Sequence, residues 1–218
     1  KGLGLTSARA RVLLQLVRSP EGVSQAAVTE FLGVAHPTIA AAIDARVLSS
    51  MKDERVSACA VIEVSPDTLY VNDKDEVVED LGQALYASRI CAYAQGMALI
   101  RAASERYEWK VNLAEIARIW KGGCIIRARL LDPVRAAFTA APDLKNLLID
   151  RALAHGLTEA EAGWRATVQM GAAGGIPLPA HASALAYFDS YRSPRLPQNL
   201  TQAQRDAFGA HTYERIDR

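Results

Sequence analysis

The carboxy-terminal segment carries the densest group of residues that could bind an anion. Residues 199–215 read NLTQAQRDAFGAHTYER, with Arg205 and His211 on either side of Gly209. We expect Gly209 to let the backbone leave a helix through positive φ, which would leave both charged side chains free to converge on one anion. Phe208 and Tyr213 could anchor the segment on an apolar surface. This pattern predicts a binding tail rather than an ordinary surface helix.

The cysteines and glycines exclude two common kinds of site. Cys59, Cys91 and Cys124 are odd in number and widely spaced, which predicts reduced, mostly buried thiols and no disulfide framework. No pair of them has metal-ligand spacing, so no metal site is expected. No G-x-G-x-x-G sequence follows a strand pattern, so we expect no cofactor-binding residue in this chain.

Several other conspicuous side chains fit structural roles better than chemical ones. We expect packing or capping from three scattered histidines: His36, His155 and His181. We expect core positions for three tryptophans with apolar neighbours: Trp109, Trp120 and Trp164. We expect structural ion pairs rather than ligand contacts from three arginines: Arg127, Arg129 and Arg135.

The composition is that of a soluble globular protein. Of 218 residues, 50% are hydrophobic and 22% are charged, and the formal net charge is +1. Such a charge gives no general attraction to nucleic acid or to an anionic membrane. Residues 169–188 form the longest weakly charged run, but they should break as a helix near Gly174 and do not predict a membrane span. The reduced thiols favour a cytoplasmic location, with a plastid as the alternative.

Helical periodicity covers most of the chain and predicts an all-α fold. The strongest pattern spans residues 73–107, a length that requires support from neighbouring helices. Asn112 is placed to cap a helix over residues 109–120, and Pro37 to open one running to about residue 55. Other predicted helices cover residues 7–17, 24–32, 125–138, 144–153, 159–170, 180–191 and 201–208, and residues 61–71 form an irregular crossing. The expected architecture is a helical domain built around a long central helix, with an extended carboxy-terminal tail.

Three long blocks of sequence resemble the 6-phosphogluconate dehydrogenase family. The first, residues 34–56, ends in DARVLSSMKDERV. The second, residues 83–131, contains ALYASRICAYAQGMAL and IWKGGCIIR, and the third is the tail from residue 175 onward. The blocks occur in order and cover nearly everything from about residue 24. The chain therefore resembles the carboxy-terminal, all-helical domain of these decarboxylating enzymes.

The resemblance implies a reaction performed by a longer protein. In the family, an amino-terminal Rossmann domain binds NADP, and the helical domain supplies the substrate pocket and the dimer interface. The enzyme oxidises the C3 hydroxyl of 6-phosphogluconate by hydride transfer to NADP, and loss of carbon dioxide leads to ribulose 5-phosphate. The family's catalytic lysine and glutamate have no counterpart in this sequence. We therefore expect no catalytic residue in this chain and no activity from it alone.

Four residues correspond to family positions that bind the substrate: Lys1, Arg46, Arg205 and His211. Lys1 opens a Lys-Gly-x-Gly turn whose family lysine binds the substrate phosphate, although the family's following Thr and Trp are absent. Arg46 takes the second phosphate-binding position, where its guanidinium fork suits bidentate capture. Arg205 and His211 match tail residues that the family inserts into the partner's active site, to bind the phosphate end and to hydrogen-bond the substrate. The implied partners are 6-phosphogluconate and a second copy of this chain, in a homodimer with exchanged tails.

Two features depart from the family pattern. Roughly twenty residues, positions 3–23, separate the Lys-Gly-x-Gly turn from the helix that follows it directly in the family. We interpret them as a retained intron, a mispredicted exon or a frameshift. Long family members also continue beyond the last residues of this sequence, so we expect a chain cut at both ends. The predicted organisation is a divergent segment at 1–23, the helical domain at 24–198 and a partner-inserting tail at 199–218.

Two other functions compete with this interpretation. Residues 24–43 also fit a helix-turn-helix template, but the face that would read bases holds almost no Arg, Asn or Gln. The low net charge supplies little attraction to phosphates, so we expect no nucleic-acid partner. The chain could instead be a helical dimerisation fragment without activity of its own, which is compatible with the family resemblance.

Overall fold

The computed structural model describes residues 35–62, 73–123, 125 and 127–214. Within these ranges every regular element is a helix, which confirms the predicted all-α class. The elements are α3 (Pro37–Ser50), α4 (Lys52–Val61), α5 (Lys74–Arg106), α6 (Leu113–Gly123), α7 (Leu131–Ala140), the 3-10 turn η1 (Leu147–Ile149), α8 (Arg151–Ala173), α9 (Pro179–Arg192) and α10 (Gln198–Gly209). The predicted helices at 7–17 and 24–32, the divergent segment at 1–23 and most of the crossing at 61–71 lie outside the described residues.

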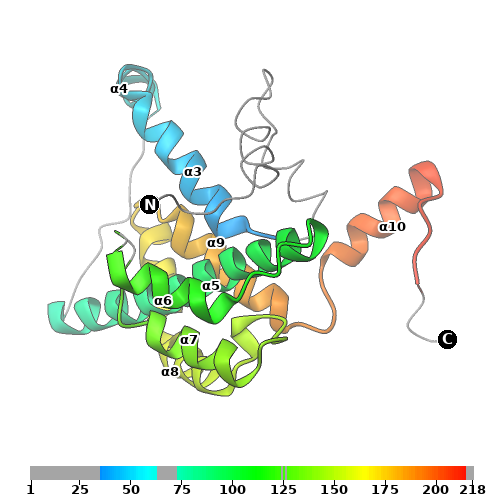
Figure 1. Cartoon of the computed structure of the whole chain (residues 1–218). Coiled ribbons are helices and arrows are strands. Elements are labelled where there is room, and N and C mark those ends of the chain that lie inside the picture. Colours follow the sequence, from blue (N-terminus) through cyan, green and yellow to red (C-terminus); the bar gives the residue numbers. More distant parts are fainter. Residues whose placement is uncertain (1–34, 63–72, 124, 126, 215–218) are drawn as a thin grey trace.

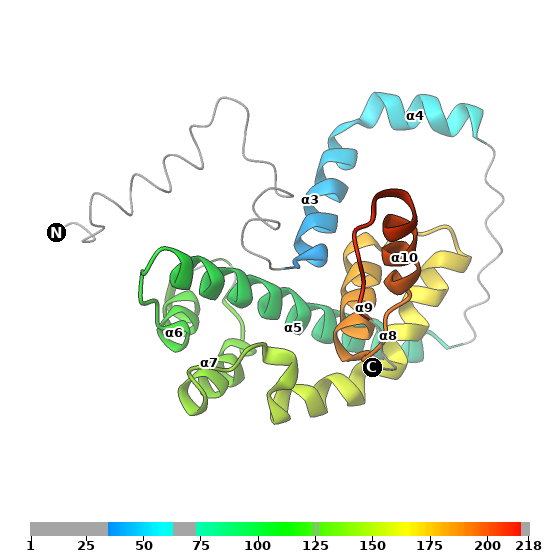
Figure 2. The same ribbon diagram turned by 90° about the vertical axis from the view of Figure 1, so that its right-hand side faces the viewer.

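The long central helix is confirmed as α5, which has 33 residues. Its first turn is closed by Asp73, whose carboxylate accepts hydrogen bonds from the backbone N–H of Asp75 at 2.8 Å and of Glu76 at 3.4 Å. This cap satisfies donors that have no partner within the helix. α8 packs along α5, and α9 and α3 lie against other parts of it (Figures 1 and 2). A helix of this length is therefore held by neighbours, as the sequence required.

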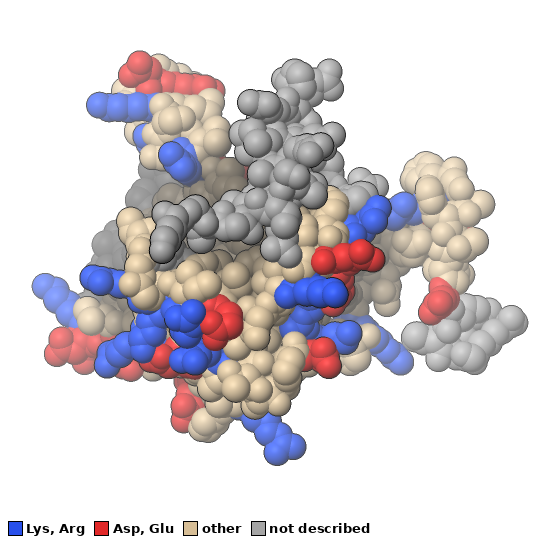
Figure 3. All heavy atoms as spheres, viewed as in Figure 1, with Lys and Arg blue, Asp and Glu red and all other residues tan. Residues whose placement is uncertain are grey.

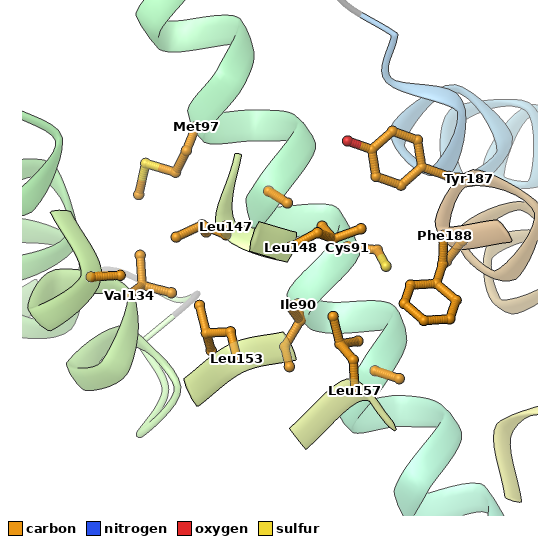
Figure 4. Packing of buried hydrophobic residues seen from close by; sticks show 14 of the residues in the cluster. Ile90, Cys91, Met97, Val134, Leu147, Leu148, Leu153, Leu157, Tyr187 and Phe188 are labelled. Atoms are coloured by element: carbon orange, nitrogen blue, oxygen red, sulfur yellow. The ribbon is translucent and has the colours of Figure 1, made fainter. Parts of the chain in front are cut away.

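The core forms where α5 meets η1, α8 and α9 (Figure 4). Trp164 of α8 is fully buried there, and its indole N–H donates to the backbone oxygen of His181 at 3.3 Å. The other central side chains come from four elements: Ile90, Cys91 and Met97 (α5), Leu147 and Leu148 (η1), Leu153 and Leu157 (α8), and Tyr187 and Phe188 (α9). One continuous apolar cluster thus fixes the elements that carry the two projecting parts of the molecule, α3–α4 and α10.

Several predicted helix boundaries are wrong, and α6 and α7 begin at Leu113 and Leu131 rather than at positions 109 and 125. The helix expected from residue 37 to about 55 is divided at Met51, where φ is −83° and ψ is 51°, so α3 and α4 run in different directions. The helices expected at 144–153 and 159–170 instead form η1 followed by the single 23-residue α8. Gly156 lies inside α8. The position suits a glycine because a Cβ there would lie only 2.6 Å from the Tyr86 hydroxyl. A tertiary contact therefore explains a glycine that resembles a helix stop.

The predicted break near Gly174 is confirmed. α8 ends at Ala173, Gly174 caps it, and Gly175 has φ 65°. The N–H of Ile176 then donates to the oxygen of Gly171 at 2.8 Å, which satisfies one of the last helical carbonyls. No helix in the described ranges is both long and apolar enough to cross a membrane.

Among the conspicuous side chains, the outcomes are mixed. Trp164 and Trp120 belong to or pack against the core, whereas Trp109 lies half-buried outside it and stacks on Tyr107 at 5.2 Å between ring centroids. Cys91 is buried but Cys59 is exposed, so the prediction of mostly buried thiols fails at Cys59, and Cys124 lies outside the described residues. Packing roles are confirmed for two histidines: His36 is buried at the start of α3, and His181 bonds the Ser88 hydroxyl at 2.9 Å. His155 is exposed, 3.3 Å from Glu159, and neither packs nor caps.

Candidate functional site

Arg46 lies on the exposed half of α3, and a buried hydrogen-bonded pair determines where that helix is. Gln95 of α5 is fully buried, and its amide oxygen accepts from the backbone N–H of Thr38 at 3.0 Å. Its amide nitrogen donates to the Thr38 hydroxyl at 2.8 Å. The first turn of α3 is thereby attached to the central helix. Arg46, two turns further on, is exposed.

Several apolar side chains on α3 and α4 are exposed, as Arg46 is. α4 has no buried residue, and Val61 at its end is 81% exposed. The exposed apolar side chains of this α3–α4 surface are Ile43, Val47, Leu48, Met51, Val56, Val61 and Ile62. Both helices rise from the top of the helical body (Figure 1). Monomeric proteins seldom expose so much contiguous apolar surface, and such a surface is typical of a protein interface.

The tail helix α10 projects from the right-hand side of the helical body in Figure 1, and none of its residues is buried. Its outer part is formed mostly by uncharged side chains (Figure 3). Phe208 is 93% exposed, and Leu200 and Tyr213 are exposed too. The predicted anchoring of Phe208 and Tyr213 on an apolar surface therefore does not occur within this chain.

The expected role of Gly209 is wrong. Gly209 is the last residue of α10, and the left-handed conformation belongs to the next residue, Ala210, with φ 51°. A Cβ on Gly209 would lie 3.3 Å from the His211 ring. The absence of a side chain at Gly209 therefore makes room for the imidazole, while an alanine takes the strained backbone position. Thr212 also has positive φ, at 55°.

After this turn the chain returns alongside α10 and is held there by two side chains. The carboxylate of Asp206 accepts from the N–H of Thr212 at 2.8 Å. The amide nitrogen of Gln202 donates to the Thr212 oxygen at 2.6 Å. These bonds fix a hook at the end of the arm. His211 lies in the hook and Arg205 on the helix before it, both exposed, so both can reach a ligand outside the chain.

A cluster of four charged residues holds the helices from which the arm departs. Arg165 and Glu161 of α8 meet Asp189 and Arg192 of α9, with N···O distances from 2.5 to 3.0 Å. The hydrogen bond from Arg165 lowers the pKa of Asp189 below its usual value. Because α9 ends at Arg192, this cluster stabilises the base of the arm.

Among the described residues, Arg46 is not brought together with Arg205 and His211 in one site (Figure 1). Lys1 lies outside the described residues. Arg46 lies on α3, whereas Arg205 and His211 lie at the end of the projecting arm, and the two parts point in different directions (Figure 1). Within the described ranges no group of three or more metal-ligating side chains occurs. What the arrangement offers is two separate surfaces with exposed apolar side chains, one carrying Arg46 and the other Arg205.

Sequence reasoning missed the exposed apolar surface of α3 and α4. Ile43, Val47 and Val56 lie in the segment predicted as one helix, whereas that helix divides at Met51 and both parts project. Ile125, in the connection between α6 and α7, was also missed and is 99% exposed. Pattern alone could not reveal either feature, because apolar spacing is the same for a face that meets the core and for one that meets another protein.

Comparisons with known proteins agree with this architecture. A family model described as "6-phosphogluconate dehydrogenase, C-terminal domain" matches residues 21–218. The chain is 55% identical over 190 residues to spinach 6-phosphogluconate dehydrogenase, decarboxylating 1, covering 85% of this chain and 39% of that protein. It is 50% identical over 187 residues to the enzyme of Synechococcus elongatus, covering 86% and 40%.

A solved structure extends the agreement to three dimensions. Plasmodium falciparum 6-phosphogluconate dehydrogenase, described in apo form and in complexes with its cofactor NADP+ and its substrate 6-phosphogluconate, superposes with a TM-score of 0.82. The sequence identity is 37%, over 99% of this chain and 44% of that one. The chain thus spans about two-fifths of the length of these relatives. It belongs to the 6-phosphogluconate dehydrogenase family and corresponds to its C-terminal domain.

Proposed function

We propose that this chain is the substrate-binding and dimerisation part of a 6-phosphogluconate dehydrogenase. The complete enzyme would oxidatively decarboxylate 6-phosphogluconate to ribulose 5-phosphate and carbon dioxide, with reduction of NADP. The observation that carries the proposal is the arm formed by α10 and its hook. It presents Arg205 and His211 beside the uncovered Phe208, and no surface among the described residues receives them. The relatives named above, which share the arm's sequence family, carry this activity in their names.

NADP does not fit the residues of this chain. Its sequence lacks a G-x-G-x-x-G turn, and the described residues form helices without a parallel strand to position one. We therefore assign the cofactor to a part of the longer relatives that this sequence does not contain. The chain alone should show no NADP reduction with 6-phosphogluconate. Its contribution would be to hold the substrate phosphate with Lys1, Arg46 and the partner's tail.

The dimer proposed here is an exchange of arms between two copies. Arg46 shares α3 with exposed apolar side chains, and the arm of a second copy would bring Phe208 to such a surface together with Arg205. Burying a fully exposed phenylalanine contributes roughly 1.5–3 kcal/mol, which is enough to fix the position of the arm. The site would then combine Arg46 of one protomer with Arg205 and His211 of the other. Two guanidinium groups and an imidazole suit a phosphorylated sugar acid.

Mixing two variants distinguishes exchanged arms from a site built within one chain. Arg46→Ala and Arg205→Ala should each abolish most binding of 6-phosphogluconate, measured by titration calorimetry. If arms are exchanged, a mixed dimer of the two variants has one site with both defects and one intact site. Binding should therefore return at up to half of the wild-type stoichiometry in the heterodimer. A mixture that dimerises but recovers no binding would contradict the exchange.

A matched control separates loss of binding from loss of assembly. Arg151 is exposed on α8, and Arg151→Ala should change neither property. Phe208→Ser should weaken self-association in light scattering, while leaving the helical content of the body unchanged. A wild-type chain that stays monomeric at high concentration would refute the dimer.

The proposed location is the cytoplasm or a plastid. The relatives include a chloroplastic enzyme from rice, 52% identical over 193 residues, as well as cyanobacterial enzymes. Fractionation of cells expressing the complete gene would decide between the two compartments.

A further inference from the structure

A cavity of about 520 Å³ lies between α5 and the connection from α6 to α7. Its walls include Gly82, Tyr86 and Arg89 from α5, and Arg127, Arg129 and Pro133 from the connection and the start of α7. We call it the arginine pocket. Arg46, Arg205 and His211 do not line it, so it is not explained by the function proposed above.

The lining of the arginine pocket carries three positive charges and no described carboxylate. No ion pair among the described residues involves Arg89, Arg127 or Arg129, so the structural ion pairs expected for the last two are not observed. The acid that follows them in the chain, Asp132, is already paired with Lys121 at 2.6 Å. Three like charges around one cavity repel one another, and an anion placed between them would relieve that repulsion.

A second cavity shows that this imbalance is particular to the arginine pocket. The cavity of about 570 Å³ between α5, α6 and α7 also contains cations, among them Arg101 and Arg135. However, its walls also include Glu105, Glu115 and Asp143. The Arg101 guanidinium is moreover engaged by the backbone oxygen of Leu144 and by the face of the Phe138 ring. That cavity balances its own charge, and the arginine pocket does not.

The remaining walls of the arginine pocket also suit an anion. Leu130 and Pro133 place the first turn of α7 at the cavity, and the amino-terminal end of a helix carries partial positive charge. Tyr86 forms an aromatic wall whose hydroxyl lies toward Gly156 of α8. The pocket is therefore a cationic recess with one apolar side.

We propose that the arginine pocket binds a small molecule carrying two phosphate groups. A guanidinium fork matches one phosphate in bidentate geometry, so three forks exceed the requirement of a single phosphate. The volume lies within the range of small-molecule sites. Inorganic pyrophosphate and a sugar bisphosphate share this chemistry, and the aromatic wall offers the second of them a surface for its carbon skeleton. The proposal does not rest on 6-phosphogluconate binding and can fail or stand separately from it.

Calorimetric titration of the 218-residue chain tests the proposal, with pyrophosphate, fructose 1,6-bisphosphate and inorganic phosphate as probes. We expect one of the two diphosphorylated probes to bind at least about tenfold more tightly than inorganic phosphate. Arg89→Ala and Arg129→Ala should each weaken that binding by about tenfold or more, since each removes a charge-assisted pair. Arg129→Lys should lose less, because the charge remains and only the fork is absent.

Arg151→Ala, a surface arginine outside the pocket, is the matched control and should bind as the wild type does. All three pocket arginines are exposed, so circular dichroism should show folded variants. Binding of pyrophosphate without binding of fructose 1,6-bisphosphate would identify an inorganic ligand. Binding of fructose 1,6-bisphosphate without binding of pyrophosphate would identify an organic one. Absence of binding to the wild type, or equal losses in Arg129→Ala and Arg151→Ala, would overturn the proposal.

Discussion

The buried amide of Gln95 should be the most sensitive single point in the attachment of α3. Gln95 and Thr38 have 0% and 5% of their surface exposed, and they are joined by two hydrogen bonds of 3.0 and 2.8 Å. Gln95→Leu keeps nearly the same volume, so it leaves no large cavity. It does leave the Thr38 N–H buried without a partner at the start of a helix, where no intrahelical acceptor exists.

The magnitude follows from these groups. A buried donor without a partner costs about 1–3 kcal/mol, and loss of the second bond adds roughly 1 kcal/mol. Gln95→Leu should therefore lower the free energy of unfolding by about 2–4 kcal/mol. For a chain of this size, 1 kcal/mol corresponds to a change in Tm of roughly 2–4 °C, so the expected decrease is about 5–15 °C. The displacement of α3 should also weaken any ligand binding that depends on Arg46.

Urea denaturation followed by circular dichroism measures the stability, and hydrogen exchange by peptide locates the loss. Exchange should accelerate in α3 and remain slow in the middle of α8. Gln169→Leu, at an exposed position of α8, is the matched control and should change stability by no more than about 0.5 kcal/mol. Thr38→Val should cost less than Gln95→Leu, and the two effects should not add, because they remove the same pair. Equal stability of the Gln95 and Gln169 variants would refute the reasoning.

Three further predictions concern the packing of α5, α8 and α9. Asp189→Asn should destabilise the chain slightly at pH 7, by less than about 1 kcal/mol because the carboxylate is partly exposed. Arg165 lowers the pKa of Asp189, so the carboxylate stabilises the fold above the unfolded pKa of about 4 and this contribution disappears as the pH falls through the lower folded pKa. Gly163→Ala should cost about 1–3 kcal/mol in chemical denaturation, since its Cβ would lie 3.0 Å from the α5 backbone. Gly82→Ala, with nothing within 4 Å, should instead stabilise by up to about 1 kcal/mol. Burial raises the pKa of Cys91 to about 12, so peptide mapping should find its thiol unmodified by iodoacetamide at pH 8 in the folded chain and modified in urea.

Each of these has a clear contrary outcome. A stability difference between wild type and Asp189→Asn that grows as the pH falls below 4 would contradict the sign of the pKa shift. Gly163→Ala as stable as Gly82→Ala would mean that α5 and α8 do not approach closely at that point. Rapid alkylation of Cys91 without denaturant would show that this part of the core opens readily.

The sequence located the main helices because their signals are local. Asp73 precedes an apolar repeat and caps α5, Asn112 accepts from the N–H of Glu115 at 3.1 Å at the start of α6, and the glycines near 174 end α8. A cap or a terminal glycine acts on backbone groups within one turn, so neighbours in sequence are enough to identify it. The same local argument was wrong at Gly209, where a glycine is used for space rather than for φ, as one also is at Gly156.

By itself the sequence determined the helical class, the long central helix and the kinship, since these depend on residue order alone. Only the tertiary structure decided which apolar faces remain uncovered, namely those of α3, α4 and α10. It also placed Arg89 beside Arg127 and Arg129, which are 38 or more positions away in the chain. Charges on separate helices act on the same ligand only when packing brings those helices together, because electrostatic repulsion and attraction depend on the distance between the charges in space.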